Sequence, residues 1–207
     1  MKRIYEKKLV PAATVNSVDE GVHLAEAMMA AGLDILEITF RTGAAGDAIQ
    51  AISERFPEML LGAGTVLTID QLDRAVGAGI CFAVAPGLNE QVVLRAAESG
   101  ITFVPGVVTP TEIERAMALG AKLLKFFPAS TMGGTATLKA LAGPYAHTGV
   151  QFVATGGINA ANAPEYLALP VVAAVGGSWM VQKDLVSAGR WDEITRLCRD
   201  ALATVAG

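Results

Sequence analysis

The residue best suited to chemistry in this chain is a lysine inside an apolar stretch. Lys125 lies within residues 123–128, whose other members are leucine, phenylalanine and a closing proline. A short apolar run of this kind is typical of a buried strand in a parallel sheet. Burial disfavours the charged form of an amine, and a neutral amine in a dry pocket is a nucleophile that forms Schiff bases with carbonyl substrates. The alternative is a lysine whose ammonium group reaches solvent or pairs with a carboxylate.

A second charge in an apolar run offers Lys125 a partner. Glu37 lies within residues 35–40, which are otherwise apolar apart from one threonine. Because side chains alternate along a strand, two buried charges on different barrel strands can both point inward and meet. The alternative is a structural ion pair, but buried pairs are costly and often no more stable than apolar replacements. We therefore favour a catalytic pair.

Two residues that follow strand ends are further candidates for substrate binding. Arg41 comes just past the run that contains Glu37, and its guanidinium fork could hold a carboxylate bidentately. The alternative for Arg41 is a surface-loop arginine. Thr65 closes the Gly-Ala-Gly-Thr sequence of residues 62–65, where small residues let backbone amides approach a ligand. Glycine turns at strand ends are common, so Thr65 alone carries little weight.

Two glycine pairs late in the chain indicate a phosphate site. Residues 155–159 read Thr-Gly-Gly-Ile-Asn, and residues 176–179 read Gly-Gly-Ser-Trp. In barrels, the turns after the seventh and eighth strands frequently bind phosphate on backbone amides. One glycine pair would be weak support, but a pair after both strands is stronger. The candidate residues are Thr155, Gly156, Gly157, Gly177 and Ser178.

A repeated pattern of helix, glycine and short apolar strand would position these residues. Glycines at 32, 79, 100 and 120 each end a helix-like segment just before an apolar run, as helix-terminating glycines do. Residues 17–20 and 68–71 are capping boxes, and residues 109–112 combine a cap, a first-turn proline and an acid. The predicted strands are residues 10–14, 35–39, 60–64, 82–85, 102–105, 123–127, 151–154 and 172–175.

Eight strand–helix units predict a (β/α)8 TIM barrel, an α/β fold, in a single domain spanning residues 1–207. The competing fold is a doubly wound open sheet, which would carry Gly-x-Gly-x-x-Gly after its first strand. The nearest match, residues 62–67, lacks the third glycine and follows the third predicted strand. The barrel is therefore the better prediction.

Composition excludes several classes of protein. Hydrophobic residues make up 52% of the chain and charged residues 17%, which indicates a tightly packed domain. The net charge of −4 and the lack of a long basic block argue against nucleic-acid binding. The longest uncharged stretch, residues 166–182, contains a proline and a glycine pair, which argues against a membrane span. Two distant cysteines and only two histidines argue against a disulfide framework and a metal site, and we expect a cytoplasmic protein.

Taken together, the motifs resemble one enzyme family nearly from end to end. The chain is similar to 2-keto-3-deoxy-6-phosphogluconate (KDPG) aldolase, a class I aldolase of the Entner–Doudoroff pathway. The segments that carry the resemblance are residues 36–42 (LEITFRT), 62–66 (GAGTV), 85–87 (APG), 104–106 (VPG), 125–129 (KFFPA), 155–158 (TGGI) and 176–179 (GGSW).

The resemblance implies a role for each matching residue. Lys125 would form the Schiff base and Glu37 would be the general acid–base. The remaining roles are pyruvate-carboxylate binding by Arg41 and Thr65, pocket shaping by Pro86 and Phe127, and phosphate binding by Gly156, Gly157 and Ser178. Members of the family form homotrimers and use neither metal nor organic cofactor. The resemblance also implies that the small-molecule partners are a phosphorylated 2-keto acid and pyruvate.

One segment departs from the family pattern. Residue 130, often glutamate in this family, is Ser130 here, in a loop near the distal end of the substrate. The related substrates 4-hydroxy-2-oxoglutarate (KHG) and 2-keto-3-deoxy-6-phosphogalactonate therefore stay open as alternatives. A non-catalytic phosphate-sugar-binding barrel is the alternative from another class, although a binder has no need of a buried amine.

Overall fold

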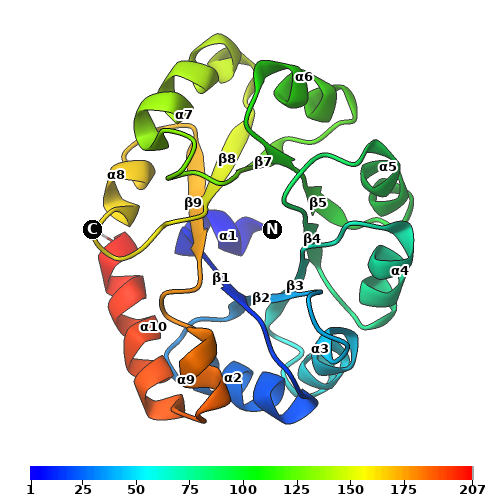
Figure 1. Ribbon diagram of the computed structural model, residues 1–207, viewed down its shortest axis with the longest axis vertical. Coiled ribbons are helices and arrows are strands. Elements are labelled where there is room, and N and C mark those ends of the chain that lie inside the picture. The colour runs from blue at the N-terminus through cyan, green and yellow to red at the C-terminus, as the bar shows by residue number, and fades with distance from the viewer. Residues whose placement is uncertain (207) are drawn as a thin grey trace.

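Parallel strands form the inner wall of a barrel, and helices form its outer layer (Figure 1). The computed structural model describes residues 1–206. Strands that follow one another in the chain pair in parallel, except for β5 and β6, and β1 also pairs with β9, so the sheet curls round on itself as the sequence predicts. The strands are β1 (Leu9–Ala13), β2 (Ile35–Thr39), β3 (Leu60–Gly64), β4 (Phe82–Val84), β5 (Thr102–Val104), β6 (Gly106–Val107), β7 (Leu123–Phe126), β8 (Gln151–Thr155) and β9 (Val172–Gly177).

The fifth predicted strand, residues 102–105, is divided in two. Pro105 separates β5, which pairs with β4, from β6, which pairs with β7. Proline has no N–H to donate to a ladder, but its carbonyl oxygen accepts a hydrogen bond from the Lys125 N–H at 2.8 Å. The two short strands together connect β4 to β7. The eight-strand barrel is confirmed, with one of its strands in two pieces.

The barrel has an inner and an outer apolar layer. Side chains that point inward fill the lower part of the interior and include Val10, Ile35, Phe82 and Leu123. The alternate side chains pack outward against the helices in a much larger cluster. Lys125 and Glu37 follow the inward parity of Leu123 and Ile35, two residues further along their strands, as the predicted alternation requires.

A short amino-terminal helix, α1 (Lys2–Lys7), which no motif in the sequence predicts, closes the lower end of the barrel. Its one buried residue, Ile4, is 1% exposed and packs onto the inner apolar layer. The Arg3 guanidinium pairs with Asp34 at 2.8 Å, and Lys7 Nζ donates to the Gly32 carbonyl oxygen at 2.9 Å. Figure 1 shows α1 behind the centre of the ring of strands.

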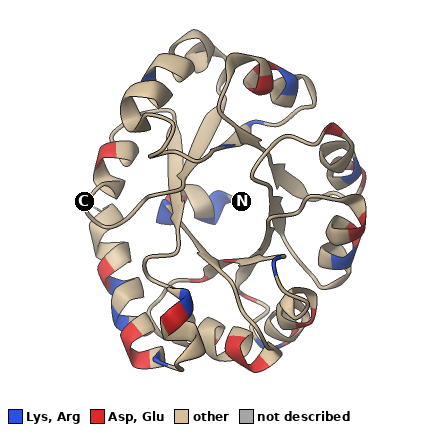
Figure 2. Cartoon of the chain, viewed as in Figure 1, with Lys and Arg blue, Asp and Glu red and all other residues tan. Residues whose placement is uncertain are grey.

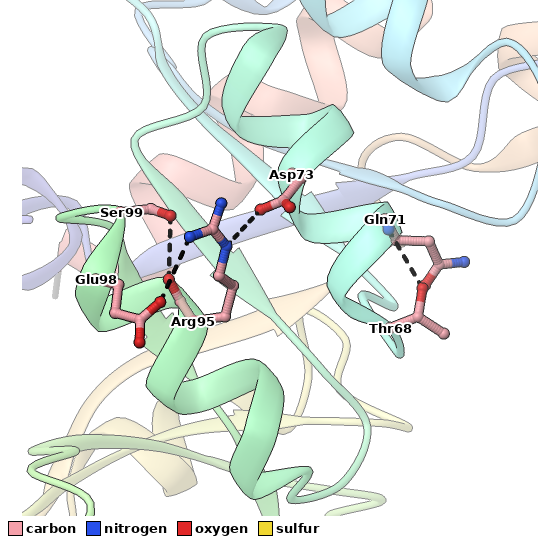
Figure 3. Close-up of polar contacts among 6 residues, drawn as sticks. All are labelled: Thr68, Gln71, Asp73, Arg95, Glu98 and Ser99. Carbon is pink, nitrogen blue, oxygen red and sulfur yellow. Dashed lines mark hydrogen bonds and ion pairs between the residues drawn. The ribbon is translucent and has the colours of Figure 1, made fainter.

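Three helices begin at the predicted caps, but of the capping motifs only the one at residues 109–112 is a complete box; those at residues 17–20 and 68–71 form the N-cap bond alone. Thr109 forms a complete capping box with Glu112, with Pro110 at the first helical position. Ser17 and Thr68 accept a hydrogen bond from the backbone N–H three residues later, which Figure 3 shows for Thr68 and Gln71. The helices are α2 (Val18–Ala30), α3 (Ala45–Arg55), α4 (Ile69–Gly77), α5 (Glu90–Glu98), α6 (Pro110–Ala118), α7 (Gly134–Ala142), α8 (Ala163–Leu167), α9 (Lys183–Ser187) and α10 (Trp191–Ala206), with a 3₁₀ helix at Gly143–Thr148.

The capping box of α6 also changes the titration of its acid. Burial raises the pKa of Glu112, but hydrogen bonds from the Val108 N–H, the Thr109 hydroxyl and the Thr109 N–H outweigh burial and leave the pKa below its usual value.

The four predicted helix-terminating glycines all have positive φ, from 70° at Gly100 to 94° at Gly79. These turns return the chain to the barrel at the lower end of the next strand.

Charge lies mainly on the outer helices, while the barrel strands carry few charged residues (Figure 2). No helix within residues 1–206 combines the length and the apolar character needed to cross a membrane. Gly207, the last residue of the predicted domain, lies outside the described residues.

Candidate active site

Lys125 and Glu37 meet inside the barrel. Lys125 is 7% exposed and Glu37 is 4% exposed, and Lys125 Nζ lies 3.9 Å from Glu37 Oε1. This separation exceeds a hydrogen bond, so the two groups attract one another without a direct donor–acceptor contact. A pair that existed only for stability would be expected to gain such a contact in return for its desolvation. A water molecule or a substrate atom can bridge groups at this separation.

Glycine at the end of β3 makes room for the glutamate. A Cβ atom at Gly64 would overlap the Glu37 carboxylate, and a Cβ atom at Gly62 would overlap the Phe82 ring. The sequence predicts that these small residues let a ligand approach the backbone. The structure gives them another use, which is to accommodate neighbouring side chains inside the barrel.

A cavity of about 340 Å³ opens above the pair at the carboxyl ends of the strands. Its volume suits a small metabolite. Pro86 is the one predicted site residue that does not line this cavity. It lies on the turn after β4, where its carbonyl oxygen packs against Gly106. The predicted residues that do line the cavity are Lys125, Glu37, Arg41, Thr65, Phe127, Thr155, Gly156, Gly157, Gly177 and Ser178.

Arg41 and Thr65 form one end of the cavity. Arg41 is exposed at the cavity mouth, and its Nε donates to Thr65 Oγ1 at 3.2 Å. Thr65 has a φ of 57°, which is unusual for a β-branched residue. Such a conformation costs about 1–3 kcal/mol and persists only where the surroundings hold it. The contact with Thr65 fixes Arg41 while leaving its two terminal nitrogens available to a carboxylate.

Two glycine turns, residues 155–158 after β8 and 176–178 after β9, form the opposite end. Gly156 and Gly157 have φ values of 99° and 75°, which only glycine adopts without strain. A Cβ atom at Gly157 would also lie 2.6 Å from the Cβ of Ser130. The turn after β8 therefore depends on glycine at both positions.

Ser130, the departure from the family pattern, supports this turn from behind. The Ser130 N–H donates to the Gly156 carbonyl oxygen at 3.0 Å, and the Ser130 hydroxyl donates to the Gly157 carbonyl oxygen at 3.0 Å. Asn162 Nδ2 donates to the same Gly157 oxygen at 2.9 Å. Ser130 does not itself line the cavity, and its hydrogen bonds go to the backbone of this turn.

Several residues that line the cavity were not predicted as site residues. Thr14 and Thr39 share a hydrogen bond, and Lys183 lies at the start of α9, the helix that follows the second glycine turn. Inward parity on the first two strands would have indicated the two threonines. No motif marks Lys183, which follows Trp179 by four residues. The other unpredicted lining residues are Ala12, Ile158 and Val181.

Within residues 1–206, no three histidine, cysteine, aspartate or glutamate side chains lie together in a group that could hold a metal ion. The reactive groups of the cavity are an amine, a carboxylate and a guanidinium. With glycine turns at the opposite end, this arrangement can bind a small acid that carries a phosphate and can form a covalent imine with its carbonyl carbon.

Comparison with known proteins gives a consistent result. A family model described as KDPG and KHG aldolase matches residues 1–197. A 2-dehydro-3-deoxy-phosphogluconate aldolase of Treponema pallidum is 45% identical over 198 residues, covering 96% of this chain and 93% of that protein. A KHG/KDPG aldolase of Escherichia coli K12 is 44% identical over 194 residues, covering 94% and 90%.

A solved structure agrees at the level of fold. The KDPG aldolase of Legionella pneumophila, crystallised with pyruvate captured at low pH as a covalent carbinolamine intermediate, superimposes with a TM-score of 0.89 at 39% identity. The match covers 93% of this chain and 92% of that one.

Proposed function

The chain belongs to the KDPG and KHG aldolase family, and from this premise we propose that it cleaves KDPG to pyruvate and glyceraldehyde 3-phosphate through a Schiff base on Lys125. The observation that carries the proposal is the buried Lys125–Glu37 pair, 3.9 Å apart, at the floor of a cavity with a guanidinium at one end and two glycine turns at the other. A class I aldolase needs those parts.

Schiff-base formation begins once Lys125 has given up its ammonium proton, to Glu37 or to water, and has become a neutral amine. Nζ attacks the C2 ketone and forms a carbinolamine, whose hydroxyl group leaves as water once it has been protonated. Glu37 moves the protons for both steps, directly or through a bridging water. The carbinolamine captured in the Legionella relative supports this step. The resulting iminium is an electron sink, so the reaction requires no metal or organic cofactor.

Carbon–carbon cleavage uses the same two residues. Glu37 accepts the proton of the C4 hydroxyl, the C3–C4 bond breaks, and its electron pair moves into the iminium to give an enamine of pyruvate. Glyceraldehyde 3-phosphate leaves, the enamine is protonated at C3, and water hydrolyses the iminium to release pyruvate and free Lys125. General acid–base catalysis of this kind contributes about 10²–10⁴ in rate.

The two ends of the cavity orient the substrate. Arg41, held by Thr65, binds the C1 carboxylate. The glycine turns, with Ser178, bind the C6 phosphate on backbone N–H groups. Phe127 lies against Lys125, whose Nζ is 5.3 Å from the ring centroid, and covers one side of the reacting amine. Pro86 shapes the pocket indirectly, through the turn after β4.

A cleavage assay tests the proposal. KDPG, KHG and 2-keto-3-deoxy-6-phosphogalactonate are each supplied, and pyruvate release is followed with and without a metal chelator. We expect the highest kcat/KM for KDPG and no loss of activity in chelator. Absence of pyruvate release from all three would overturn the proposal.

KHG is the second candidate substrate, because the Escherichia coli relative is named for both activities. A KHG kcat/KM above that for KDPG would make KHG aldolase the principal activity and leave the Schiff-base mechanism intact.

We also propose a cytoplasmic homotrimer, which the family resemblance supports. Light scattering on the purified protein should give three times the mass of one chain. A monomer that retains full activity would contradict the trimer.

A further inference from the structure

Two threonines on neighbouring strands meet at the cavity wall. Thr14 Oγ1 lies 2.7 Å from Thr39 Oγ1, and both residues line the cavity. Thr39 is 5% exposed. The register between β1 and β2 pairs Ala12 with Glu37 and Ala13 with Ile38, so the next step brings the two threonines side by side.

This threonine pair has hydrogen-bonding capacity left over. One hydroxyl donates to the other, which uses one of the two protons and one of the four oxygen lone pairs. The remaining proton and lone pairs can bond to a group in the cavity, which both residues line. A polar group buried to this extent normally has such a partner. No step of the proposed mechanism uses either side chain.

The position of the pair within the barrel identifies the partner. Thr39 follows Glu37 by two residues on the same face of β2. Thr14 follows β1, and β1 pairs on its other side with β9, where Pro11 is opposite Gly177. The threonine pair therefore lies between the acid–base residue and the glycine turns. In KDPG, the C5 hydroxyl lies between the C4 hydroxyl, which Glu37 deprotonates, and the C6 phosphate.

We propose that Thr14 and Thr39 together bind the C5 hydroxyl of the substrate and so select an aldehyde that carries a hydroxyl next to its carbonyl. This inference rests on the proposed aldolase function. A site built to hydrogen-bond a substrate hydroxyl rejects an analogue that lacks it, because its own polar groups are then left unpaired. The threonine pair thus sets specificity for the aldehyde half of the substrate, on the C4 side of the C3–C4 bond that breaks.

The test compares two aldehyde substrates, with and without the hydroxyl, in the wild-type enzyme and in variants that lack a threonine hydroxyl. In the synthetic direction, pyruvate is condensed with glyceraldehyde 3-phosphate or with 3-phosphopropanal, which lacks the hydroxyl that becomes C5-OH. Wild type should favour glyceraldehyde 3-phosphate in kcat/KM by about tenfold, the scale of one hydrogen bond in a desolvated site. Thr14→Val, which keeps the shape and removes the hydroxyl, should reduce that preference to about onefold to twofold.

Two further variants separate recognition from structure. Thr14→Ser restores the hydroxyl and should restore the preference for glyceraldehyde 3-phosphate. Thr39→Val removes the other hydroxyl and should also reduce the preference, so either variant decides the question if the other fails to fold. The ratio between aldehydes is the readout because a merely structural role would slow both reactions equally.

The outcomes are distinguishable. A wild-type enzyme that condenses neither aldehyde with pyruvate would overturn the proposed function itself. An active wild type with no preference between the aldehydes would overturn the threonine inference alone. So would a folded Thr14→Val that keeps the wild-type preference.

Discussion

Two ion pairs in this molecule have opposite geometry in opposite surroundings. On the surface between α4 and α5, Arg95 Nε lies 2.9 Å from Asp73 Oδ1, and both side chains are more than 40% exposed (Figure 3). Inside the barrel, Lys125 and Glu37 are 3.9 Å apart, and their side chains are 9% and 5% exposed. The closer pair is in solvent, and the looser pair is buried.

The difference in distance and burial between the two pairs indicates that the buried pair serves the reaction and not the stability of the fold. Hydrogen bonding to Asp73 raises the pKa of Arg95, yet an exposed pair contributes little to stability because water and salt screen it. A buried pair loses its hydration, and only close contacts can compensate for that loss. The Lys125–Glu37 pair lacks such a contact, so its presence is better explained by the reaction than by the fold.

Removing the buried amine should give the largest effect. Lys125→Ala should abolish KDPG cleavage while leaving a folded protein, because Lys183, the other lysine that lines the cavity, is exposed at the start of α9 and is not buried beside the carboxylate of Glu37. Lys122→Ala is the matched control, since Lys122 is exposed and precedes β7 at the other end of the barrel. Turnover and circular dichroism are measured for both. Appreciable turnover in the folded Lys125 variant would contradict the account.

Neutralising its partner should give the next largest effect. Glu37→Gln keeps the size of the side chain and removes its basicity, so kcat should fall by about 10²–10⁴ with a modest change in KM. Steady-state kinetics on KDPG checks this split. A variant with the kcat of wild type would remove Glu37 from the acid–base role.

The inner parts of the site could be predicted because strand parity determines them. A charge in an apolar strand is conspicuous in sequence, and alternation placed both Lys125 and Glu37 on the inside. The glycine pairs were recognisable for a similar reason, since their positions after the last two strands match a known arrangement of barrels. Residues that follow strands by one or two positions are positioned by the strands themselves.

Other features depend on contacts that sequence does not reveal. Helix α1 is six residues long, and Ile4 is its one buried residue. Ile4 is buried only because the lower end of the barrel is there to pack against, and this contact cannot be read from the sequence of the helix. Lys183 reaches the cavity because α9 begins beside it, and Pro86 falls outside because its turn packs against Gly106. The fifth strand is divided at Pro105 because proline has no N–H to donate to the ladder. The proline marks where pairing stops, but the sequence does not show that a second short strand follows it.

A smaller effect is expected at the exposed cation of the cavity. Lys183 lines the cavity from the start of α9, the helix that follows the turn at residues 176–178, and we propose that it attracts the substrate phosphate. Lys183→Gln should raise the KM for KDPG by about tenfold at low ionic strength, and less in salt, because the lost attraction is screened. Lys139→Gln on the outer helix α7 is the control. A KM that is equal in both variants at low salt would exclude Lys183 from phosphate binding.

The smallest effect is expected at the surface pair. Asp73→Asn removes the ion pair with Arg95 but leaves an oxygen to accept its hydrogen bond. Thermal unfolding and KDPG turnover should both stay at wild-type values. A large loss of stability would mean that the exposed pair holds α4 and α5 in place, and the contrast between the two pairs would then fail.

Borohydride trapping shows directly whether Lys125 forms the Schiff base with pyruvate. Enzyme and pyruvate are mixed, reduced with borohydride and digested, and the peptides are examined by mass spectrometry. We expect a reduced pyruvate adduct on Lys125, absent when pyruvate is omitted and absent from Lys122. An active enzyme that acquires no adduct on Lys125 would contradict this expectation.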